Sequence, residues 1–254
     1  MNILFTICGR AGSKGVKNKN IRMFLGKPLY MYTLRSIVLY MQQYANIKEH
    51  YDMIISTDSP DFLQKFSHNK DILCRERPVE LSQDNTPKMP VILDALEYAQ
   101  NITNTPYDYV IDLDITSPLR TVQDIRNAYE KKIKCAEAQV VYSVTHARRN
   151  PYFNMVKQNG AFFSRVLSTD FVSRQQAPVV YDMNASIYVY EASFLKSGAQ
   201  SPLDGKGDII IMKDTGVIDI DSEEDFIMME WIASRMAQTE KGYQEIFCFD
   251  DHIV

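Results

Sequence analysis

The chain has 254 residues, and its 28 lysines and arginines against 32 aspartates and glutamates give a net charge of −4. This length can bury a substantial core, and the charge gives no reason to expect a nucleic-acid partner. No apolar run is long enough to span a membrane, and the first is too short for a signal peptide. Four scattered cysteines without a C-x-x-C pair predict reduced thiols and a cytoplasmic location.

Strands and helices are expected to alternate along the chain. Apolar runs rich in β-forming residues predict strands at 3–8, 53–56, 72–74, 109–114 and 139–144. Apolar residues at helical spacing predict helices at 29–43, 60–66, 87–100, 121–134 and 222–236. Asp58 or Ser59 is expected to cap the second helix, and Thr121 opens a capping box with Asp124. This order predicts an α/β fold with a mostly parallel central sheet flanked by helices.

A basic, glycine-rich loop follows the first predicted strand. It combines glycines, which turn tightly and let a ligand approach the backbone, with side chains that suit phosphate oxygens. These residues are Gly9, Arg10, Gly12, Ser13, Lys14, Gly15, Lys17 and Lys19. Their spacing fits neither a Walker A loop nor a dinucleotide fingerprint. Because open α/β sheets bind ligands at the carboxyl ends of their strands, a polyphosphate site is favoured over a flexible basic turn.

The segment GRAGSKGVKNKNIRMFLGKPL resembles the N-terminal signature of the acylneuraminate cytidylyltransferases, R-x-G-S-K-x-x-x-x-K-N-x-x-x-x-x-G-x-P-L. Further matching motifs lie near residues 77, 116, 174 and 219, so the resemblance covers nearly the whole chain. It implies a Rossmann-like nucleotidyltransferase fold. It also implies that a nine-carbon, sialic-type acid reacts with CTP to give a CMP-sugar and pyrophosphate, for cell-surface glycan biosynthesis.

The resemblance assigns the nucleotide to two segments. The nucleotide-binding residues it implies are Arg10, Gly12, Ser13, Lys14, Lys19, Asn20, Arg77, Asp84, Thr86 and Lys88. Arg10 and Lys19 are also expected to be catalytic, with Lys19 stabilising transition-state charge. The residues alone leave a simpler interpretation open, in which Arg77 and Asp84 form a surface ion pair in a turn.

The block DLDITSPLR, residues 112–120, is expected to contact the sugar acid. Asp114 stands where many relatives have Gln, so an acceptor-only carboxylate replaces an amide. This form is similar to synthetases for legionaminic acid, although N-acetylneuraminic acid remains an alternative substrate. The expected sugar-binding residues are Asp114, Thr116, Ser117, Arg174, Gln175 and Tyr181.

Residues 148–183 break the alternating rhythm and are rich in aromatic and basic side chains. Asn159-Gly160 predicts a hairpin turn within them. The resemblance implies that this excursion from a single domain, 1–254, is a homodimerisation arm that helps bind the sugar in the neighbouring subunit. Ser173 replaces the first Arg of the family pattern R-R-Q-x-x-P.

Two aspartates near the C-terminus form a candidate metal site. Asp219 and Asp221 alternate, so on a strand they would share one face and repel each other without a cation between them. The resemblance implies that they are catalytic residues that hold Mg²⁺, or Mn²⁺, and so lower the pKa of the attacking hydroxyl. Ser222 and Asp225 then fit a capping box at a helix start.

Three alternatives remain open from the sequence. The Asp112-x-Asp114 pair is typical of metal-dependent nucleotide-sugar glycosyltransferases. A synthetase for the eight-carbon acid KDO would use the same reaction on another substrate. A non-catalytic nucleotide-binding regulator would share the fold, but it has no evident use for both the basic loop and the aspartate pair.

Overall fold

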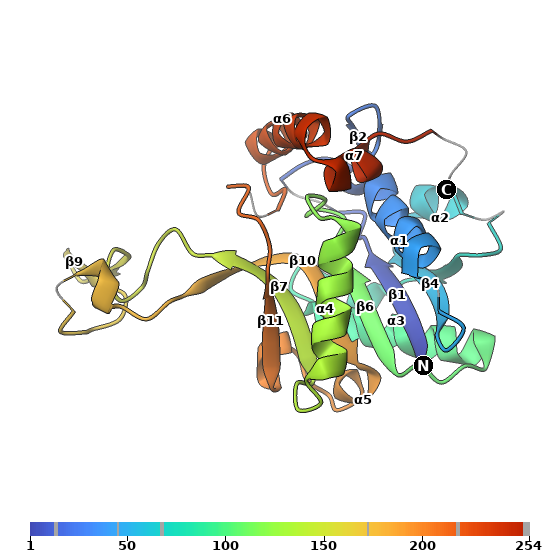
Figure 1. Ribbon diagram of the computed structural model, residues 1–254, viewed down its shortest axis with the longest axis horizontal. Helices are drawn as coiled ribbons and strands as arrows, with labels where there is room; N and C mark the ends of the chain where they lie inside the picture. Colours follow the sequence, from blue (N-terminus) through green and yellow to red (C-terminus); the bar gives the residue numbers. More distant parts are fainter. Residues whose placement is uncertain (13–14, 45, 67–68, 172, 217–218, 251–254) are drawn as a thin grey trace.

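The computed structural model describes the chain except residues 13–14, 45, 67–68, 172, 217–218 and 251–254. A seven-stranded sheet in the order β11-β7-β10-β6-β1-β4-β5 forms its centre (Figure 1). Its strands are β1 (Asn2–Cys8), β4 (His50–Thr57), β5 (Leu73–Glu76), β6 (Tyr109–Leu113), β7 (Val140–His146), β10 (Tyr181–Glu191) and β11 (Gly207–Ile211). Strand β10 runs antiparallel to both its neighbours, and the other pairs are parallel. The predicted, mostly parallel sheet is confirmed.

Helices cover both faces of the sheet because the buried strands alternate their side chains between two clusters. Ile3, Phe5 and Ile7 of β1 pack in the first cluster, and Leu4 packs in the second. The first also holds apolar faces of α1 (Tyr30–Tyr44), α2 (Pro60–Gln64), α4 (Val122–Lys134), α6 (Glu223–Thr239) and α7 (Lys241–Phe247). The second holds those of α3 (Lys88–Thr103) and α5 (Ala192–Leu195).

Side-chain caps start three of these helices where the sequence predicts them. The capping box of Thr121 and Asp124 opens α4, and that of Ser222 and Asp225 opens α6. Ser59, rather than Asp58, caps α2 by accepting a bond from the Phe62 amide. Asp58 is therefore left for another role.

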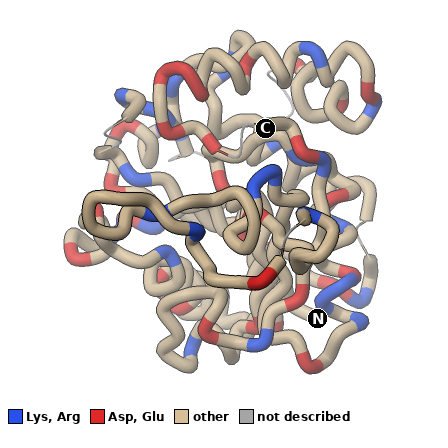
Figure 2. Tube along the Cα trace, turned by 90° about the vertical axis from the view of Figure 1, so that its left-hand side faces the viewer, with Lys and Arg blue, Asp and Glu red and all other residues tan. Residues whose placement is uncertain are grey.

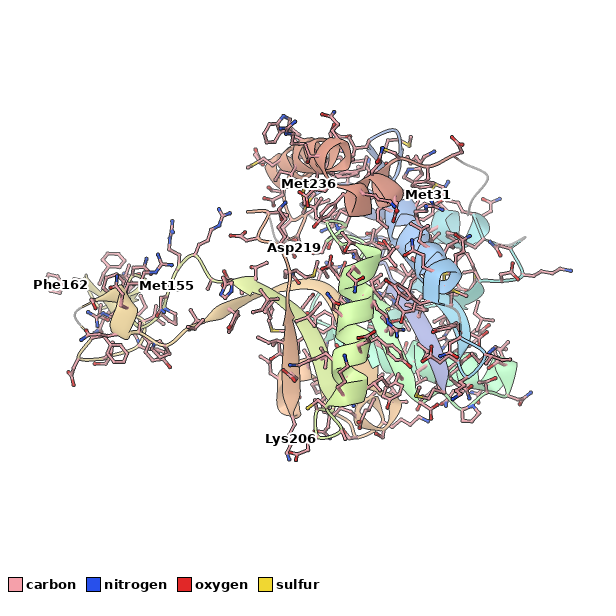
Figure 3. All side chains as sticks on the ribbon, viewed as in Figure 1. Met31, Met155, Phe162, Lys206, Asp219 and Met236 are labelled. Atoms are coloured by element: carbon pink, nitrogen blue, oxygen red, sulfur yellow. The ribbon has the colours of Figure 1, made fainter. Side chains whose placement is uncertain are left out.

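A two-stranded hairpin projects from the body of the protein (Figure 1). Strands β8 (Val156–Asn159) and β9 (Phe162–Arg165) pair antiparallel, and Gly160 takes a left-handed conformation between them, with φ 64°. The predicted hairpin is thus confirmed. Figure 3 places Met155 and Phe162 far from Asp219, out on this projection.

The remaining elements are short. Strands β2 (Met23–Phe24) and β3 (Lys27–Pro28) form a two-stranded ribbon before α1. Single 3₁₀ turns span Lys19–Ile21, Val79–Leu81, Arg174–Gln176 and Pro202–Asp204. Within the described part of the chain, every helix is too short or too polar to cross a membrane.

Candidate active site

An open cavity of about 300 Å³ lies beyond the carboxyl ends of β1 and β6. Three stretches far apart in the sequence line it: the basic loop, the turn after β6, and the segment before α6. The lining residues are Cys8, Gly9, Arg10, Gly15, Lys19, Asn20, Asp114, Thr116 and Asp221. The position is the one at which open α/β sheets bind ligands, as the sequence predicts.

Neighbouring strands hold the basic loop in place. The Gly9 amide donates to the Ser56 carbonyl over 3.0 Å, and the Ala11 amide donates to Asp58 Oδ1 over 2.8 Å. Asn20 Nδ2 donates to the Arg10 carbonyl over 3.1 Å. Asp58 therefore anchors the loop, a role that sequence reasoning missed. Ser13 and Lys14, both expected to bind phosphate, lie outside the described residues.

The basic loop is in direct contact with the segment that precedes α6. Lys19 Nζ donates to the Ile220 carbonyl and lies 3.5 Å from Asp221 Oδ1. A Cβ atom on Gly15 would overlap the carbonyl oxygen of Asp221, so only glycine allows this approach. Two expected catalytic residues, Lys19 and Asp221, are thus brought together across the chain.

The prediction that Asp219 and Asp221 lie on a strand is wrong, because the backbone from Asp219 to Asp221 is irregular. Ile220 is fully buried, and its amide donates to the Thr116 carbonyl over 3.0 Å. The flanking Asp219 and Asp221 stay close to each other, and Asp221 lines the cavity. Burial raises the pKa of Asp219, and the neighbouring carboxylates of Asp221 and Asp114 raise it further, against the opposing charge of Lys19.

This excess of negative charge fits a divalent cation. Among the described residues there is no cluster of three or more His, Cys, Asp or Glu side chains that could enclose a metal ion. An ion held by Asp219 and Asp221 would therefore take its other ligands from phosphate and water. Mg²⁺ is commonly bound in this way, through one or two carboxylates.

The second expected nucleotide segment meets the first through Asp84. Asp84 forms an ion pair with Arg10, and both side chains are partly exposed. Arg77 is buried, and its Nη2 donates to the Ser56 carbonyl over 2.7 Å. The interpretation of Arg77 and Asp84 as a surface ion pair is therefore wrong. Thr86 lies in the same segment, and its Oγ1 donates to the Glu80 carbonyl over 3.4 Å.

Lys88 bridges two aspartates, of which Asp114 lines the cavity. Its Nζ lies 2.7 Å from both Asp112 Oδ2 and Asp114 Oδ2. Asp112 is fully buried and also accepts a bond of 2.7 Å from Thr6 Oγ1 on the neighbouring strand. The ammonium group therefore occupies the space between the two carboxylates that a D-x-D metal site would need.

Asp114 is an ionised acceptor at the cavity wall. Thr116 donates to its Oδ1 through the backbone amide over 2.9 Å and through Oγ1 over 3.0 Å. Burial acts to raise the pKa of Asp114, but the charge of Lys88 and these bonds outweigh it and lower the pKa to about 2. Asp114 and Thr116 are thus placed where the sequence expects sugar contacts.

Arg120 stabilises the turn after β6 through hydrogen bonds to its backbone. The side chain is fully buried and donates to the carbonyls of Asp114 and Ser117 and to Ser186 Oγ. Ser117 is also buried and donates to the Asn184 carbonyl over 2.9 Å. Ser117, expected to contact the sugar, therefore supports the turn and does not line the cavity.

The other expected sugar-binding residues lie at the base of the projecting hairpin. Arg174 lines a second cavity of about 310 Å³ with His146, Asn150 and residues 177–180. Gln175 shares its 3₁₀ turn with Arg174, and the Tyr181 ring lies tilted against His146 with the ring centroids 5.1 Å apart. Within one chain these residues do not join the first cavity.

A profile of the cytidylyltransferase family matches residues 4–201. The chain therefore belongs to the cytidylyltransferase family. Its sequence is 37% identical over 241 residues to the CMP-N,N'-diacetyllegionaminic acid synthase of Campylobacter jejuni subsp. jejuni serotype O:2, covering 95% of this chain and 99% of the relative. Over 230 residues it is 36% identical to post-translational flagellin modification protein B of Campylobacter coli, covering 91% and 94%.

Solved cytidylyltransferase structures share the fold. CMP:2-keto-3-deoxy-manno-octonic acid synthetase complexed with CTP superposes with a TM-score of 0.62 at 14% identity, covering 92% of this chain and 99% of that chain. The resemblance stated from the sequence is confirmed, and the chain is a nucleotidyltransferase. The family match ends at residue 201, yet Asp221, beyond it, lines the same cavity as Arg10.

Proposed function

We propose that this cytidylyltransferase activates a sialic-type nonulosonic acid with CTP, giving the CMP-sugar and pyrophosphate. N,N'-Diacetyllegionaminic acid is the preferred substrate, and N-acetylneuraminic acid is the next candidate. One observation carries the proposal: a single cavity joins the basic loop to Asp114, in a chain 37% identical to a CMP-N,N'-diacetyllegionaminic acid synthase.

The reaction needs alignment and charge neutralisation more than a covalent protein intermediate. The anomeric hydroxyl would attack the α-phosphorus of CTP while pyrophosphate leaves. Arg10 and Lys19 at the cavity wall would bind the phosphates, together with Gly12, Ser13 and Lys14. Lys19 would stabilise the charge that grows on the phosphate oxygens. Supporting this role, its ammonium group reaches the segment that carries Asp221.

Asp219 and Asp221 would hold Mg²⁺, or Mn²⁺. The bound ion would lower the pKa of the attacking hydroxyl and neutralise phosphate charge. The raised pKa of Asp219, which follows from burial and from two nearby carboxylates, supports a cation at this position.

We further propose that residues 1–254 act as a single domain in a homodimer, with residues 148–183 as the dimerisation arm. An isolated two-stranded hairpin is marginally stable at best in water. Phe162 and Phe163 on β9 are 79% and 72% exposed, as an unpaired interface would be. Arg174, Gln175 and Tyr181 would then complete the sugar site of the partner subunit.

We propose the cytoplasm as the place of action and cell-surface glycan biosynthesis as the use of the product. Supporting a reducing compartment, all four cysteines have free thiols.

Pyrophosphate release tests the proposed function. The purified chain, CTP and Mg²⁺ are mixed in turn with N,N'-diacetyllegionaminic, N-acetylneuraminic, pseudaminic and KDO acids. We expect the highest kcat/KM with the legionaminic acid, and none with ATP, UTP or GTP as donor. An Asp114→Gln variant should shift the preference towards N-acetylneuraminic acid. If no acid releases pyrophosphate although CTP binds, the proposal is wrong.

A further inference from the structure

Lys88 is an unusual residue for its place in the fold. It is the first residue of α3, where the helix dipole disfavours a cation, and no side chain caps this helix. Two carboxylates account for it: Asp112 and Asp114 each place an oxygen 2.7 Å from its ammonium nitrogen. The same ammonium lies 5.5 Å from the centre of the Tyr188 ring, which favours a cation at its face.

In these contacts the ammonium group of Lys88 interacts with side chains of the protein itself. The contact with Asp112 is held in place because Asp112 is fully buried, and removing Lys88 would leave its charge uncompensated. Two of the three ammonium N–H groups are directed at Asp112 and Asp114, so only the third is left for a phosphate, and the fully buried Asp112 keeps the nitrogen close to the protein interior. The geometry therefore favours a role for Lys88 in holding the two aspartates over the expected contact with the nucleotide.

Asp114 has one acceptor position left for a ligand. An ionised carboxylate offers roughly four acceptor positions. Thr116 N, Thr116 Oγ1 and Lys88 Nζ fill three of them. The remaining position, on a residue that lines the cavity, accepts only from an N–H or O–H group and repels a carboxylate.

We propose that Lys88 is a positioning residue for the sugar-acid site, fixing Asp114 as an anionic acceptor that selects a hydrogen-bond donor on the sugar. The assignment of the ligand as a sugar acid rests on the proposed function. Asp112 acts as a buried second counterion, which holds the Lys88 ammonium group between the two carboxylates. The donor is an amide N–H or a hydroxyl, and the sugar's own carboxylate faces away from Asp114.

Lys88→Met tests this by separating nucleotide from sugar. Calorimetry of CTP binding to the variant should give a Kd within about twofold of the parent's. The KM for the sugar acid should rise about tenfold or more, the usual effect of losing a charge-assisted contact. Lys206→Met is the matched control, because Lys206 is exposed at the opposite end of the sheet from Asp219 (Figure 3). It should change neither value.

A double-mutant cycle shows whether Lys88 acts through Asp114. A neutral Gln needs no counterion, so in an Asp114→Gln background Lys88→Met should change the sugar KM by less than about twofold. If Lys88→Met fails to fold because Asp112 is left unpaired, Lys88→Met with Asp112→Asn removes both buried charges and carries the same expectations.

Two results would overturn the inference. One is a rise of about tenfold in the CTP Kd, the size expected for a lost charged contact to phosphate. The other is a sugar KM effect that stays equally large in the Asp114→Gln background. A parent protein that releases no pyrophosphate with any acid counts against the proposed function instead, and the CTP calorimetry still decides whether Lys88 binds the nucleotide.

Discussion

At the level of single residues, the cavity is built from opposing charges. Asp219, Asp221 and Asp114 bring three carboxylates close enough for each of the other two to raise the pKa of Asp219. Lys19 offsets part of this charge from the basic loop. In the ligand-free protein such an arrangement costs stability, and a cation between the carboxylates would relieve it.

Asp221→Asn should therefore remove metal-dependent activity while leaving the fold intact. We expect pyrophosphate release to fall at least about a hundredfold, because the proposed metal would supply several kcal/mol of transition-state stabilisation and each 1.4 kcal/mol is about tenfold. Rates measured across a Mg²⁺ series provide the test, and adding Mg²⁺ with CTP should raise the Tm of the parent more than that of the variant.

The control for this prediction is Glu224→Gln. It makes the same change of charge at an exposed position in the first turn of α6 and should leave the Mg²⁺ series unchanged. Full activity of Asp221→Asn with normal Mg²⁺ dependence would reject the metal assignment.

At the level of elements, the start of α6 aims the second aspartate at the basic loop. The Asp225 carboxylate accepts bonds from the amides of Asp221 and Ser222, over 3.1 and 2.8 Å. The helix cap thus fixes the backbone whose carbonyl meets Gly15. The basic loop and the aspartate pair are therefore held together by the close approach of Gly15 to the Asp221 carbonyl and by the bond from Lys19 to the Ile220 carbonyl.

Gly15→Ala should disturb this register. The new Cβ would overlap backbone that cannot move without shifting α6, and such overpacking typically costs about 1–3 kcal/mol. We expect the Tm of the ligand-free protein to fall by a few degrees and turnover to fall more steeply than CTP affinity. Gly12→Ala is the contrast, since nothing lies within 4 Å of its Cβ position, and it should leave the Tm unchanged. Equal Tm values for both variants would contradict this account.

The elements themselves were largely predictable from local pattern. Strand β6 and helix α4 match their predicted ranges within one residue, because apolar runs and a capping box mark them. Strand β10 was not predicted: polar Asp182 and Asn184 interrupt it, and its register shifts between Met183 and Tyr188.

The site was predictable in composition but not in pairing. The motif resemblance named Arg10, Asp84, Lys88 and Asp114. Their ion-pair partners, however, depend on which strand ends lie next to each other in the folded sheet. Asp112 was named only as a rival metal ligand, although a charged residue inside a buried strand is itself a signal of a buried ion pair. The strand expected at Asp219 failed because the buried Ile220 anchors that segment to Thr116.

At the level of the whole molecule, the projecting hairpin is the feature on which the proposed dimer depends. Viewed from the side of the hairpin, the segment in front carries few charges (Figure 2). Residues 151–180 include Lys157, Arg165, Asp170 and Arg174 as their charged side chains. An exposed hairpin with few charges and two solvent-exposed phenylalanines has the composition that is typical of a protein interface.

Replacing both Phe162 and Phe163 by Ser should weaken the dimer. Losing two aromatic side chains that the proposed dimer would bury should raise its dissociation constant at least about a hundredfold. Sedimentation across a concentration series provides the measurement, with Ile47→Ser as control because that side chain is fully exposed on the body. A parent protein that sediments as one 29.3 kDa chain would contradict the dimer.

Mixing two inactive variants would show whether the arm works in the partner's site. On the proposed roles, Lys19→Ala would inactivate the cavity of its own chain, and Arg174→Ala would inactivate the arm. If the arm acts across the dimer, a hybrid joins the intact Arg174 arm of one chain to the intact Lys19 cavity of the other. Co-refolded mixtures should then recover a substantial part of parental turnover, whereas either variant alone stays inactive. No recovery in a verified hybrid would mean that each chain completes its own site, even though Arg174 and Lys19 line separate cavities within one chain.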